Sequence, residues 1–320
     1  MTVLVIGATG FIGAPLAQRL LARGEEVIAV SRGGGGPGGV ACDRRDVAAL
    51  TAVIAARGVD TIVDLLAYTV ADTLPLFGAV GGRIERYVLA SSLDVYRNYE
   101  GLHGKARPTP ILGPMSEDAP LRTTRYPYRL DPRRHPDSED AWLDHYDKIP
   151  IEAALRNADL RHTILRLPMT YGTGDRQQRF RWVISPMLKA RPRLTIDPAW
   201  AAWRTTYGYV DDVADALAHG ALHDQARDRT FNLGEPDPPD HRAWVNRFAR
   251  VLDWSGEIAL EAAPPESPIA GLNLDFPLIA DTSAFRAACG WSEPTLLEGR
   301  LGRTVAEQRA RDSLVVRPLG

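Results

Sequence analysis

The chain has 320 residues, 45% of them hydrophobic, and a formal net charge of −2 at pH 7. This length suffices for one large α/β domain or for a main domain with a smaller partner. The near-neutral charge gives no broad basic surface for nucleic acid, and no run of about 18 apolar residues could span a bilayer. We therefore expect neither nucleic acid nor a membrane as a partner.

The cysteine pattern and the N-terminus bear on metal binding and location. Cys42 and Cys289 have no metal-like spacing, so we expect free thiols in a reducing compartment and no metal site. The apolar N-terminus lacks a basic leader and a cleavage pattern. These features predict a cytoplasmic protein.

The N-terminal segment combines a short apolar strand, a glycine-rich turn and a helix that ends at Gly24. Glycines suit such a turn because backbone N–H groups at a helix N-terminus reach a pyrophosphate only where no Cβ blocks the approach. The turn therefore predicts a dinucleotide cofactor. Its expected contacts are Gly7, Thr9, Gly10, Phe11, Ile12 and Gly13.

The residues that end the second strand, Glu26–Val30, indicate which dinucleotide binds. NAD sites commonly carry an acidic residue there for the ribose 2′-OH, whereas NADP sites combine an uncharged residue with an arginine. The residues here are Ser31 and Arg32. They favour NADP, although NAD remains possible.

Strand and helix patterns continue to alternate after this point. We expect strands at 40–43, 61–67, 86–92, 162–167 and 229–233, and helices at 46–57, 71–82, 141–157, 211–223 and 241–252. This alternation predicts an α/β fold with a doubly wound parallel Rossmann sheet. Ligands of such sheets bind beyond the carboxyl ends of the strands. Further cofactor contacts are therefore expected at Asp43, Leu66, Ala67, Leu167 and Pro168.

Regularity fails in two regions. Residues 96–140 are rich in proline and too long for an ordinary loop, so we interpret them as a lid over a binding site. Beyond residue 169 the pattern is mixed, with a helix expected at 177–190, an aromatic turn at 200–209 and an irregular stretch at 264–277. We predict a cofactor domain of residues 1–168 with 205–234 returning to it. Residues 169–204 and 235–320 would mainly form a smaller C-terminal substrate domain.

Five short motifs in order resemble the extended short-chain dehydrogenase/reductase family, in particular its nucleotide-sugar epimerase and dehydratase branch. They are Gly7-Ala-Thr-Gly10-Phe-Ile-Gly13, Ser91-Ser92-Leu-Asp94-Val-Tyr96, Leu165-Arg166-Leu-Pro168-Met-Thr-Tyr171-Gly172, Tyr209-Val-Asp211-Asp212 and Phe231-Asn232-Leu-Gly234. The resemblance spans almost the whole chain. It implies a cofactor-carrying Rossmann domain, a small-molecule substrate held by the C-terminal domain, and a homodimer.

The family's chemistry uses a tyrosine phenolate as acid/base, a lysine four residues later and a Ser or Thr that bonds the reacting oxygen. A nearby cation stabilises the phenolate, so that a phenol can act near neutral pH. The resemblance gives Ser92 the hydroxyl role, and Lys148 the lysine role, which includes a bond to the cofactor ribose. It further implies substrate contacts at Ser92, Tyr96, Met169, Thr170 and Arg204.

The family's tyrosine is missing from its usual position. Asp144 stands four residues before Lys148, and Tyr146 lies only two before it, about 200° away on a regular helix. Either the helix begins after Tyr146, so that its ring enters the site from a non-helical turn, or another group transfers the proton.

Asp94 is the alternative acid/base. It stands two residues after Ser92, where the dehydratases of the family carry an acid that removes a proton next to a transient ketone. Partial burial would raise its pKa for such a role. A turn or N-cap aspartate is an equally good interpretation.

These patterns together predict an NAD(P)-dependent oxidoreductase of the epimerase/dehydratase type. Its substrate would be a hydroxyl or ketone of a sugar or sugar nucleotide. Two alternatives remain: an NADPH-dependent reductase of a specialised-metabolite ketone, and a cofactor-sensing protein without catalysis.

Overall fold

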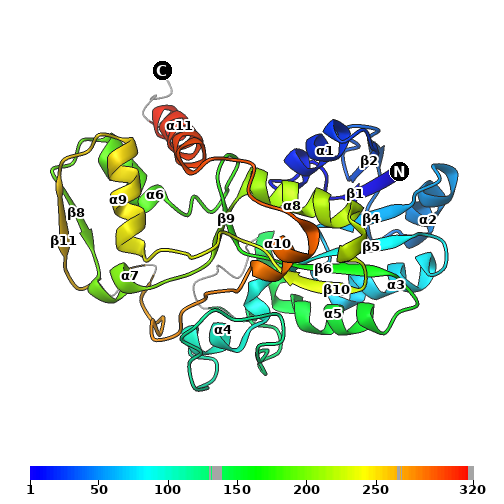
Figure 1. The fold of residues 1–320 in the computed structure, drawn as a ribbon, viewed down its shortest axis with the longest axis horizontal. Helices are drawn as coiled ribbons and strands as arrows, with labels where there is room; N and C mark the ends of the chain where they lie inside the picture. The colour runs from blue at the N-terminus through cyan, green and yellow to red at the C-terminus, as the bar shows by residue number, and fades with distance from the viewer. Residues whose placement is uncertain (130, 132–138, 265–266, 268, 316–320) are drawn as a thin grey trace.

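A computed structural model describes residues 1–129, 131, 139–264, 267 and 269–315. Parts of the predicted lid and of the predicted irregular stretch, residues 130, 132–138, 265–266 and 268, lie outside this description. The molecule is elongated, with a sheet-containing lobe at one end and a smaller lobe at the other (Figure 1).

The larger lobe is built on a seven-stranded parallel sheet in the order β10-β6-β5-β4-β1-β2-β3. The chain runs outward from β1 to β3, then returns beside β1 and continues in the opposite direction with β4. Ligands of such sheets bind at this reversal. The strands are β1 (Thr2–Ile6), β2 (Glu26–Ser31), β3 (Val40–Ala41), β4 (Thr61–Asp64), β5 (Arg86–Ser92), β6 (His162–Leu167) and β10 (Arg229–Asn232). The predicted α/β Rossmann sheet is confirmed.

Helices cover both faces of the sheet because its central strands are apolar on both sides. One apolar cluster joins the sheet to α1 (Gly13–Ala22), α8 (Val210–Leu222) and α10 (Ser283–Cys289). A second joins the other face to α2 (Val47–Ala56), α3 (Val70–Val80) and α5 (Lys148–Arg156). In Figure 1, α1 and α8 lie above the sheet, and α3 and α5 lie below it.

The smaller lobe has an aromatic core in which Phe180 packs against Trp244 and Phe248. Two short parallel strand pairs, β7 with β9 and β8 with β11, complete it. Its elements are β7 (Met169–Tyr171), α6 (Arg181–Leu188), β8 (Arg193–Ile196), α7 (Pro198–Ala202), β9 (Tyr207–Tyr209), α9 (His241–Val251), β11 (Glu257–Leu260) and α11 (Leu297–Val315). The proposed domain limits stay a prediction; α10 packs on the sheet and not in this lobe.

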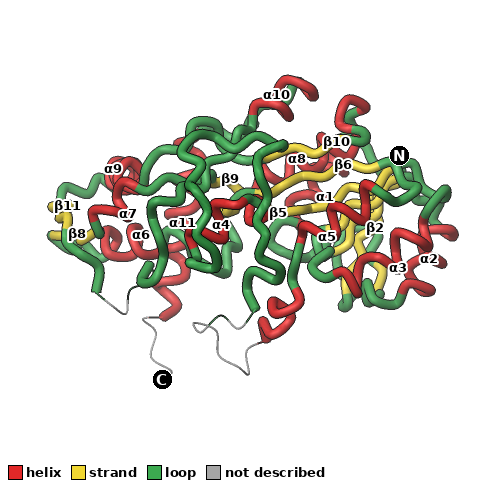
Figure 2. The backbone as a smooth tube through the Cα atoms, turned by 90° about the horizontal axis from the view of Figure 1, so that it is seen from below, coloured by secondary structure: helices red, strands yellow, loops and turns green. Residues whose placement is uncertain are grey.

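In the described part of the predicted lid the chain forms the short helix α4 (Arg97–Leu102), and loops follow it up to residue 129. Figure 2 shows this segment in the middle of the molecule, between the sheet and the smaller lobe. It therefore lies over the carboxyl ends of the strands. Short 3-10 turns flank the site at Leu93–Val95 and Glu139–His145, and another follows α8 at Asp224–Ala226.

Three predicted elements were wrong in extent. The helix expected at 141–157 is interrupted, since a 3-10 segment ends at His145 and α5 begins only at Lys148. The helix expected at 177–190 is reduced to α6. The expected aromatic turn instead contains α7, because the Asp197 side chain caps that helix and Pro198 begins it.

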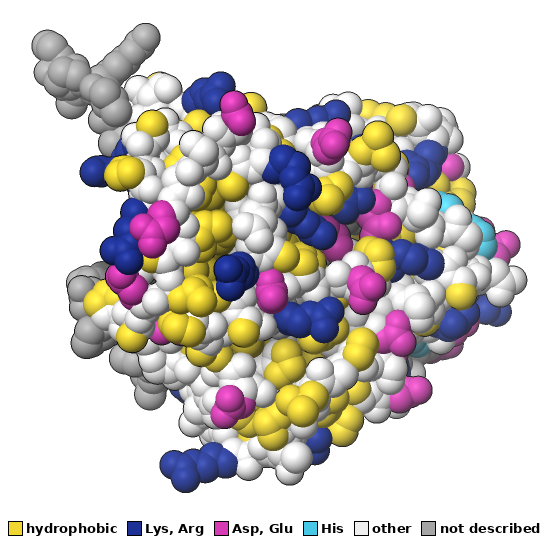
Figure 3. All heavy atoms as spheres, turned by 60° about the vertical axis from the view of Figure 1, so that its left-hand side comes forward, with side chains coloured by type: hydrophobic (Ala, Val, Ile, Leu, Met, Phe, Trp, Pro, Cys, Tyr) yellow, Lys and Arg dark blue, Asp and Glu magenta, His cyan; other side chains and the backbone are white. Residues whose placement is uncertain are grey.

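The surface and the helices give further observations. Among the described residues, no helix is both long and apolar enough to cross a membrane. The face of the smaller lobe in Figure 3 carries positive and negative side chains dispersed among apolar ones.

Candidate active site

The glycine turn has the geometry of an anion cradle. Gly7 has a φ of 89°, and the Gly10 N–H donates to the Gly7 carbonyl at 3.0 Å. A Cβ on Gly13 would lie 2.0 Å from the Gly7 oxygen, so only glycine allows α1 to start this close to β1. A Cβ on Gly10 would meet only that oxygen within 4 Å, so the outer side of the turn is open. Ile12 caps α1 without a side-chain hydrogen bond, leaving N–H groups for a pyrophosphate.

The carboxyl end of β2 carries the residues expected to choose the cofactor. The Ser31 hydroxyl is buried and finds no hydrogen-bond partner among the described residues, while Arg32 is exposed. Asp43, after β3, binds the backbone and side chain of Arg45, which lowers the pKa of Asp43 to about 2. An unpartnered buried hydroxyl beside an exposed arginine fits the ribose end of a dinucleotide.

Residues after β4 and β6 complete the cofactor side. The Leu66 side chain packs against the turn, since a Cβ on Gly7 would lie 3.0 Å from Leu66 Cγ. Ala67 presents its carbonyl to Lys148. Leu167 is partly buried against the core below the turn, and Pro168 packs near Gly208 of β9. The predicted contacts thus lie along one edge of the sheet.

Lys148 is the first residue of α5 and only 3% exposed. Its Nζ donates to the carbonyls of Ala67 and Ala90, each at 2.7 Å. An ammonium has three N–H donors, so one remains for a ligand hydroxyl. Burial lowers the pKa of Lys148 to about 8.

Tyr146 reaches the site although it stands only two residues before the lysine. Because α5 begins at Lys148, Tyr146 is not on the regular helix, and its hydroxyl donates to Asp94 Oδ2 at 2.9 Å. The interpretation that placed Tyr146 on the wrong face of a continuous helix was wrong. The alternative of a helix that begins after Tyr146 is the one the structure has.

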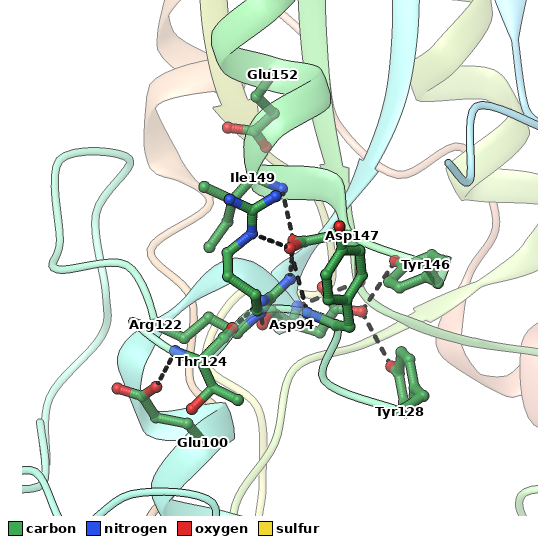
Figure 4. A network of polar contacts seen from close by, with 12 residues as sticks. Asp94, Glu100, Arg122, Thr124, Tyr128, Tyr146, Asp147, Ile149 and Glu152 are labelled. Carbon is green, nitrogen blue, oxygen red and sulfur yellow. Dashed lines mark hydrogen bonds and ion pairs between the residues drawn. The ribbon is translucent and has the colours of Figure 1, made fainter. Parts of the chain in front are cut away.

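Asp94 is the centre of the cluster and is 5% exposed. Its Oδ2 also accepts the Tyr128 hydroxyl at 3.0 Å, and its backbone N–H donates to Ser92 Oγ at 3.2 Å (Figure 4). Its Oδ1 is buried, and the part of the chain that the structure describes gives it no hydrogen-bond partner. Burial raises the pKa of Asp94, and burial together with the Asp94 charge raises the pKa of Tyr146. The Tyr146 hydroxyl is therefore held as a hydrogen-bond donor to the Asp94 carboxylate.

Aromatic rings surround this carboxylate. Tyr128 and Tyr146 meet edge to face at 5.2 Å, and Trp142 stacks on Tyr68 at 4.4 Å. Lys148 Nζ lies 5.0 Å from the Tyr68 ring centroid and 5.6 Å from that of Tyr146. Such an environment excludes water and strengthens charge interactions inside it.

Asp147 lies between the two catalytic candidates. Its carboxylate caps α5 by accepting the Ile149 N–H at 3.3 Å. The same carboxylate binds Arg122 and Arg125, each at 2.6 Å. Figure 4 shows Asp147 with Arg122 and Ile149 beside the Asp94 cluster.

Some predicted substrate contacts lie elsewhere. Tyr96 is fully buried, and its hydroxyl donates to Asn232 at 2.6 Å while Arg166 donates to it at 2.8 Å. It therefore belongs to the structural core and not to the cluster. Arg204 is exposed, and its Nε donates to the Pro238 carbonyl at 2.9 Å. Met169 and Thr170 lie in β7, where the Thr170 hydroxyl donates to the Pro168 carbonyl.

Residues that sequence reasoning missed come from the lid and from the helix start. Arg122 and Tyr128 lie in an irregular segment in which no spacing links them to Asp94. Asp147 did carry a signal, since an aspartate directly before an apolar periodic stretch is a common N-cap. In the described parts of the chain, no group of three or more His, Cys, Asp or Glu could hold a metal ion.

Comparison with known proteins agrees with this geometry. Residues 3–75 match the family model described as the NAD dependent epimerase/dehydratase family. No curated protein matches the chain in sequence. This N-terminal match agrees with the resemblance noted in the sequence, and solved structures share the fold of the whole chain.

These solved structures include three sugar-nucleotide epimerases. UDP-glucose 4-epimerase from Thermus thermophilus, complexed with NAD, is 21% identical with a TM-score of 0.67, covering 97% of this chain and 99% of that one. UDP-glucose-4-epimerase from Stenotrophomonas maltophila, with NAD and formylated UDP-arabinopyranose, is 18% identical with a TM-score of 0.70 and coverages of 98% and 99%. UDP-glucuronic acid 4-epimerase from Bacillus cereus, with UDP-glucuronic acid and NAD, is 18% identical with a TM-score of 0.67 and coverages of 97% and 100%.

Proposed function

We propose that this protein is an NAD(P)-dependent oxidoreductase of the epimerase/dehydratase type, acting on a hydroxyl or ketone of a sugar nucleotide. The observation that carries the proposal is the convergence of Ser92, Asp94, Tyr146 and Lys148 beside the glycine turn. The N-terminal family match and the fold of UDP-sugar epimerases support it.

In this proposal the glycine turn and Lys148 hold the cofactor. The open side of Gly10 receives the pyrophosphate, and the remaining N–H of Lys148 bonds a ribose hydroxyl. When bound, a nicotinamide accepts or donates a hydride at the substrate carbon. Lys148 adds positive charge that stabilises a developing phenolate at Tyr146.

The proton steps are assigned to Ser92, Tyr146 and Asp94. Ser92 bonds the reacting oxygen, and Tyr146 exchanges the proton of that oxygen with Asp94 across 2.9 Å. In the dehydratase alternative Asp94 takes no proton from Tyr146, and its Oδ1, for which no hydrogen-bond partner is found among the described residues, instead removes a proton from the carbon next to the ketone. The raised pKa of Asp94 suits a base that must later return its proton.

NADP is the proposed cofactor, supported by Ser31 and Arg32 at the end of β2. A guanidinium recognises a 2′-phosphate, and no acidic side chain stands at position 31 to repel it. The same two residues favour a second candidate function, an NADPH-dependent reductase. The homodimer and the cytoplasmic location stay predictions.

The first experiment identifies the cofactor that copurifies with the protein. Denatured protein is analysed by absorbance and mass spectrometry, and the refolded or native protein is mixed with UDP-glucose or UDP-glucuronic acid while absorbance at about 340 nm is followed. Tightly held oxidised cofactor and absorbance changes with a sugar nucleotide support the epimerase or dehydratase. Exchangeable NADPH that is consumed by ketones supports the reductase, and binding without turnover contradicts both.

A further inference from the structure

A single buried guanidinium connects the segments that carry the proposed catalytic groups. Arg122 Nη2 lies 2.6 Å from Asp147 Oδ1, and both side chains have no exposed surface. Its Nε donates to the backbone carbonyl of Asp94 at 3.0 Å. Arg122 therefore ties the Asp94 turn to the residue between Tyr146 and Lys148.

Asp147 is fixed from several sides. Its backbone is extended, with φ −162° and ψ 109°, and its N–H donates to the Tyr68 carbonyl at 3.1 Å. Its carboxylate accepts the N–H groups of Ile149 and Tyr126 and pairs with both arginines. This extended residue begins α5 at Lys148 and so keeps Tyr146 off the helix.

The consequence is a defined separation between Tyr146 and Asp94. A regular helix through residue 146 would turn the ring about 200° away from the face of Lys148. In the structure the two side chains instead meet at 2.9 Å. The contact depends on the backbone conformation at Asp147 and on the position of the turn that carries Asp94. Arg122 binds the Asp147 carboxylate and the Asp94 carbonyl, and so fixes both segments.

We propose that the buried Arg122–Asp147 pair is a positioning device that holds Tyr146 against Asp94 and Lys148 at the start of α5. Neither residue of the pair needs to touch substrate. The geometric claim stands on the structure of the chain, while its effect on turnover rests on the proposed function. Because Arg122 lies in the predicted lid, the position of the chain at residue 122 is coupled to the geometry of the proton-transfer groups.

Tyrosine resonances test the claim without cofactor or substrate. The full chain is labelled with ¹³Cζ-tyrosine, and the signals of Tyr146 and Tyr128 are assigned by Tyr146→Phe and Tyr128→Phe. Asp94→Asn should move both signals, because both hydroxyls donate to the same carboxylate oxygen. Asp147→Asn and Arg122→Lys should move the Tyr146 signal in the direction that Asp94→Asn moves it, because each variant weakens the contact between Tyr146 and Asp94.

Asp147→Asn is a mild variant, because asparagine can still cap α5 and accept from Arg122. The matched control is Asp212→Asn, which weakens the buried pair between Asp212 of α8 and Arg300 of α11. The control should destabilise the protein without moving the Tyr146 signal. If Asp147→Asn fails to fold, Arg125→Ala replaces it, because half-exposed Arg125 binds the same carboxylate. It should shift the signal in the same direction by less.

If the protein turns over a sugar nucleotide, its reaction rate provides a second test of the positioning role. Asp147→Asn should lower kcat roughly ten- to a hundredfold and shift the pH–rate profile, with cofactor affinity within about twofold. A folded Asp147→Asn with an unmoved Tyr146 signal overturns the positioning role. A moved signal in a protein that turns over no sugar nucleotide keeps the positioning role and contradicts the proposed function.

Discussion

The glycine turn completes its geometry within a few residues, since the Gly10 N–H meets the Gly7 carbonyl and Gly13 packs on that same oxygen. The cluster at Asp94 depends on contacts between distant segments, because Tyr128 lies 34 residues and Tyr146 52 residues further along the chain. Local geometry can be recognised in a sequence. A cluster assembled over such separations needs the fold before its members can be named.

The largest expected effect is at the turn. Gly10→Val should abolish cofactor binding and leave the fold intact, because its side chain would occupy the open outer side of the turn. Calorimetric titration with NADP and NAD measures the loss. Gly13→Ala is the contrasting variant: its Cβ would collide with the Gly7 carbonyl, so it should also lower stability by about 1–3 kcal/mol. Unchanged cofactor affinity in Gly10→Val would contradict the proposed cofactor site.

The next effect concerns the long-range cluster. Lys148→Ala and Asp94→Asn should each reduce turnover by about a hundredfold or more, because each removes a positioned charge from a buried site. Single-turnover absorbance measurements at saturating cofactor separate this loss from weaker binding. Near-normal rates in Asp94→Asn would exclude the carboxylate from proton transfer.

Two tyrosines that share one carboxylate oxygen provide a matched comparison. Tyr146→Phe should lower the rate by about a hundredfold, because Lys148 lies close enough to stabilise its phenolate. Tyr128→Phe should cost less than about tenfold, since no lysine contact with Tyr128 is found among the described residues. Equal losses in both variants would show that the hydroxyls act only through their bonds to Asp94.

The pKa of Lys148 predicts a pH dependence. Burial lowers it from 10.5 to about 8, so the lysine loses its charge above about pH 8 in the folded protein. Cofactor affinity should therefore fall between about pH 7 and about pH 9, and should stay low and flat in Lys148→Ala. In the unfolded chain Lys148 keeps its proton up to higher pH than in the folded protein. Its contribution to the free energy of unfolding therefore rises with pH over the same range. A loss of cofactor affinity between about pH 7 and about pH 9 would therefore not result from unfolding caused by the titration of Lys148.

The smallest effect is cofactor choice. The protein should prefer NADP(H), and the double change Ser31→Asp and Arg32→Ala should reverse the preference. Titration of both cofactors decides this. A tenfold preference of the unmodified protein for NAD(H), about 1.4 kcal/mol, would show the assignment to be wrong.

Most of the Rossmann sheet could be predicted from the sequence because its strands are continuous apolar runs and its helices have clear periodicity. The start of α5 was left open between two alternatives, because apolar spacing around residues 141–157 also fits a single helix. The break depends on the buried Asp147, whose partners Arg122 and Arg125 lie more than 20 residues earlier.

The single residues of the site also differ in whether the sequence points to them. Ser92 and Lys148 were identified through short motifs, whereas Tyr128 and Arg122 lie in a segment without periodicity. Tyr96 followed a motif but is buried in a network with Asn232 and Arg166. A motif thus predicts the neighbourhood of a residue better than the direction of its side chain.

The extended backbone at Asp147 also affects how relatives of this chain can be found. A pattern search that requires tyrosine four residues before lysine would reject this chain and classify it as inactive, although the Tyr146 hydroxyl donates to Asp94 and Lys148 Nζ lies 5.6 Å from the Tyr146 ring centroid. A better query would tolerate a two-residue spacing where an Asp, Asn, Ser or Thr directly precedes the lysine, since such a residue can begin the helix there. Collections of dehydrogenase-like sequences set aside for a missing tyrosine are the place to apply it.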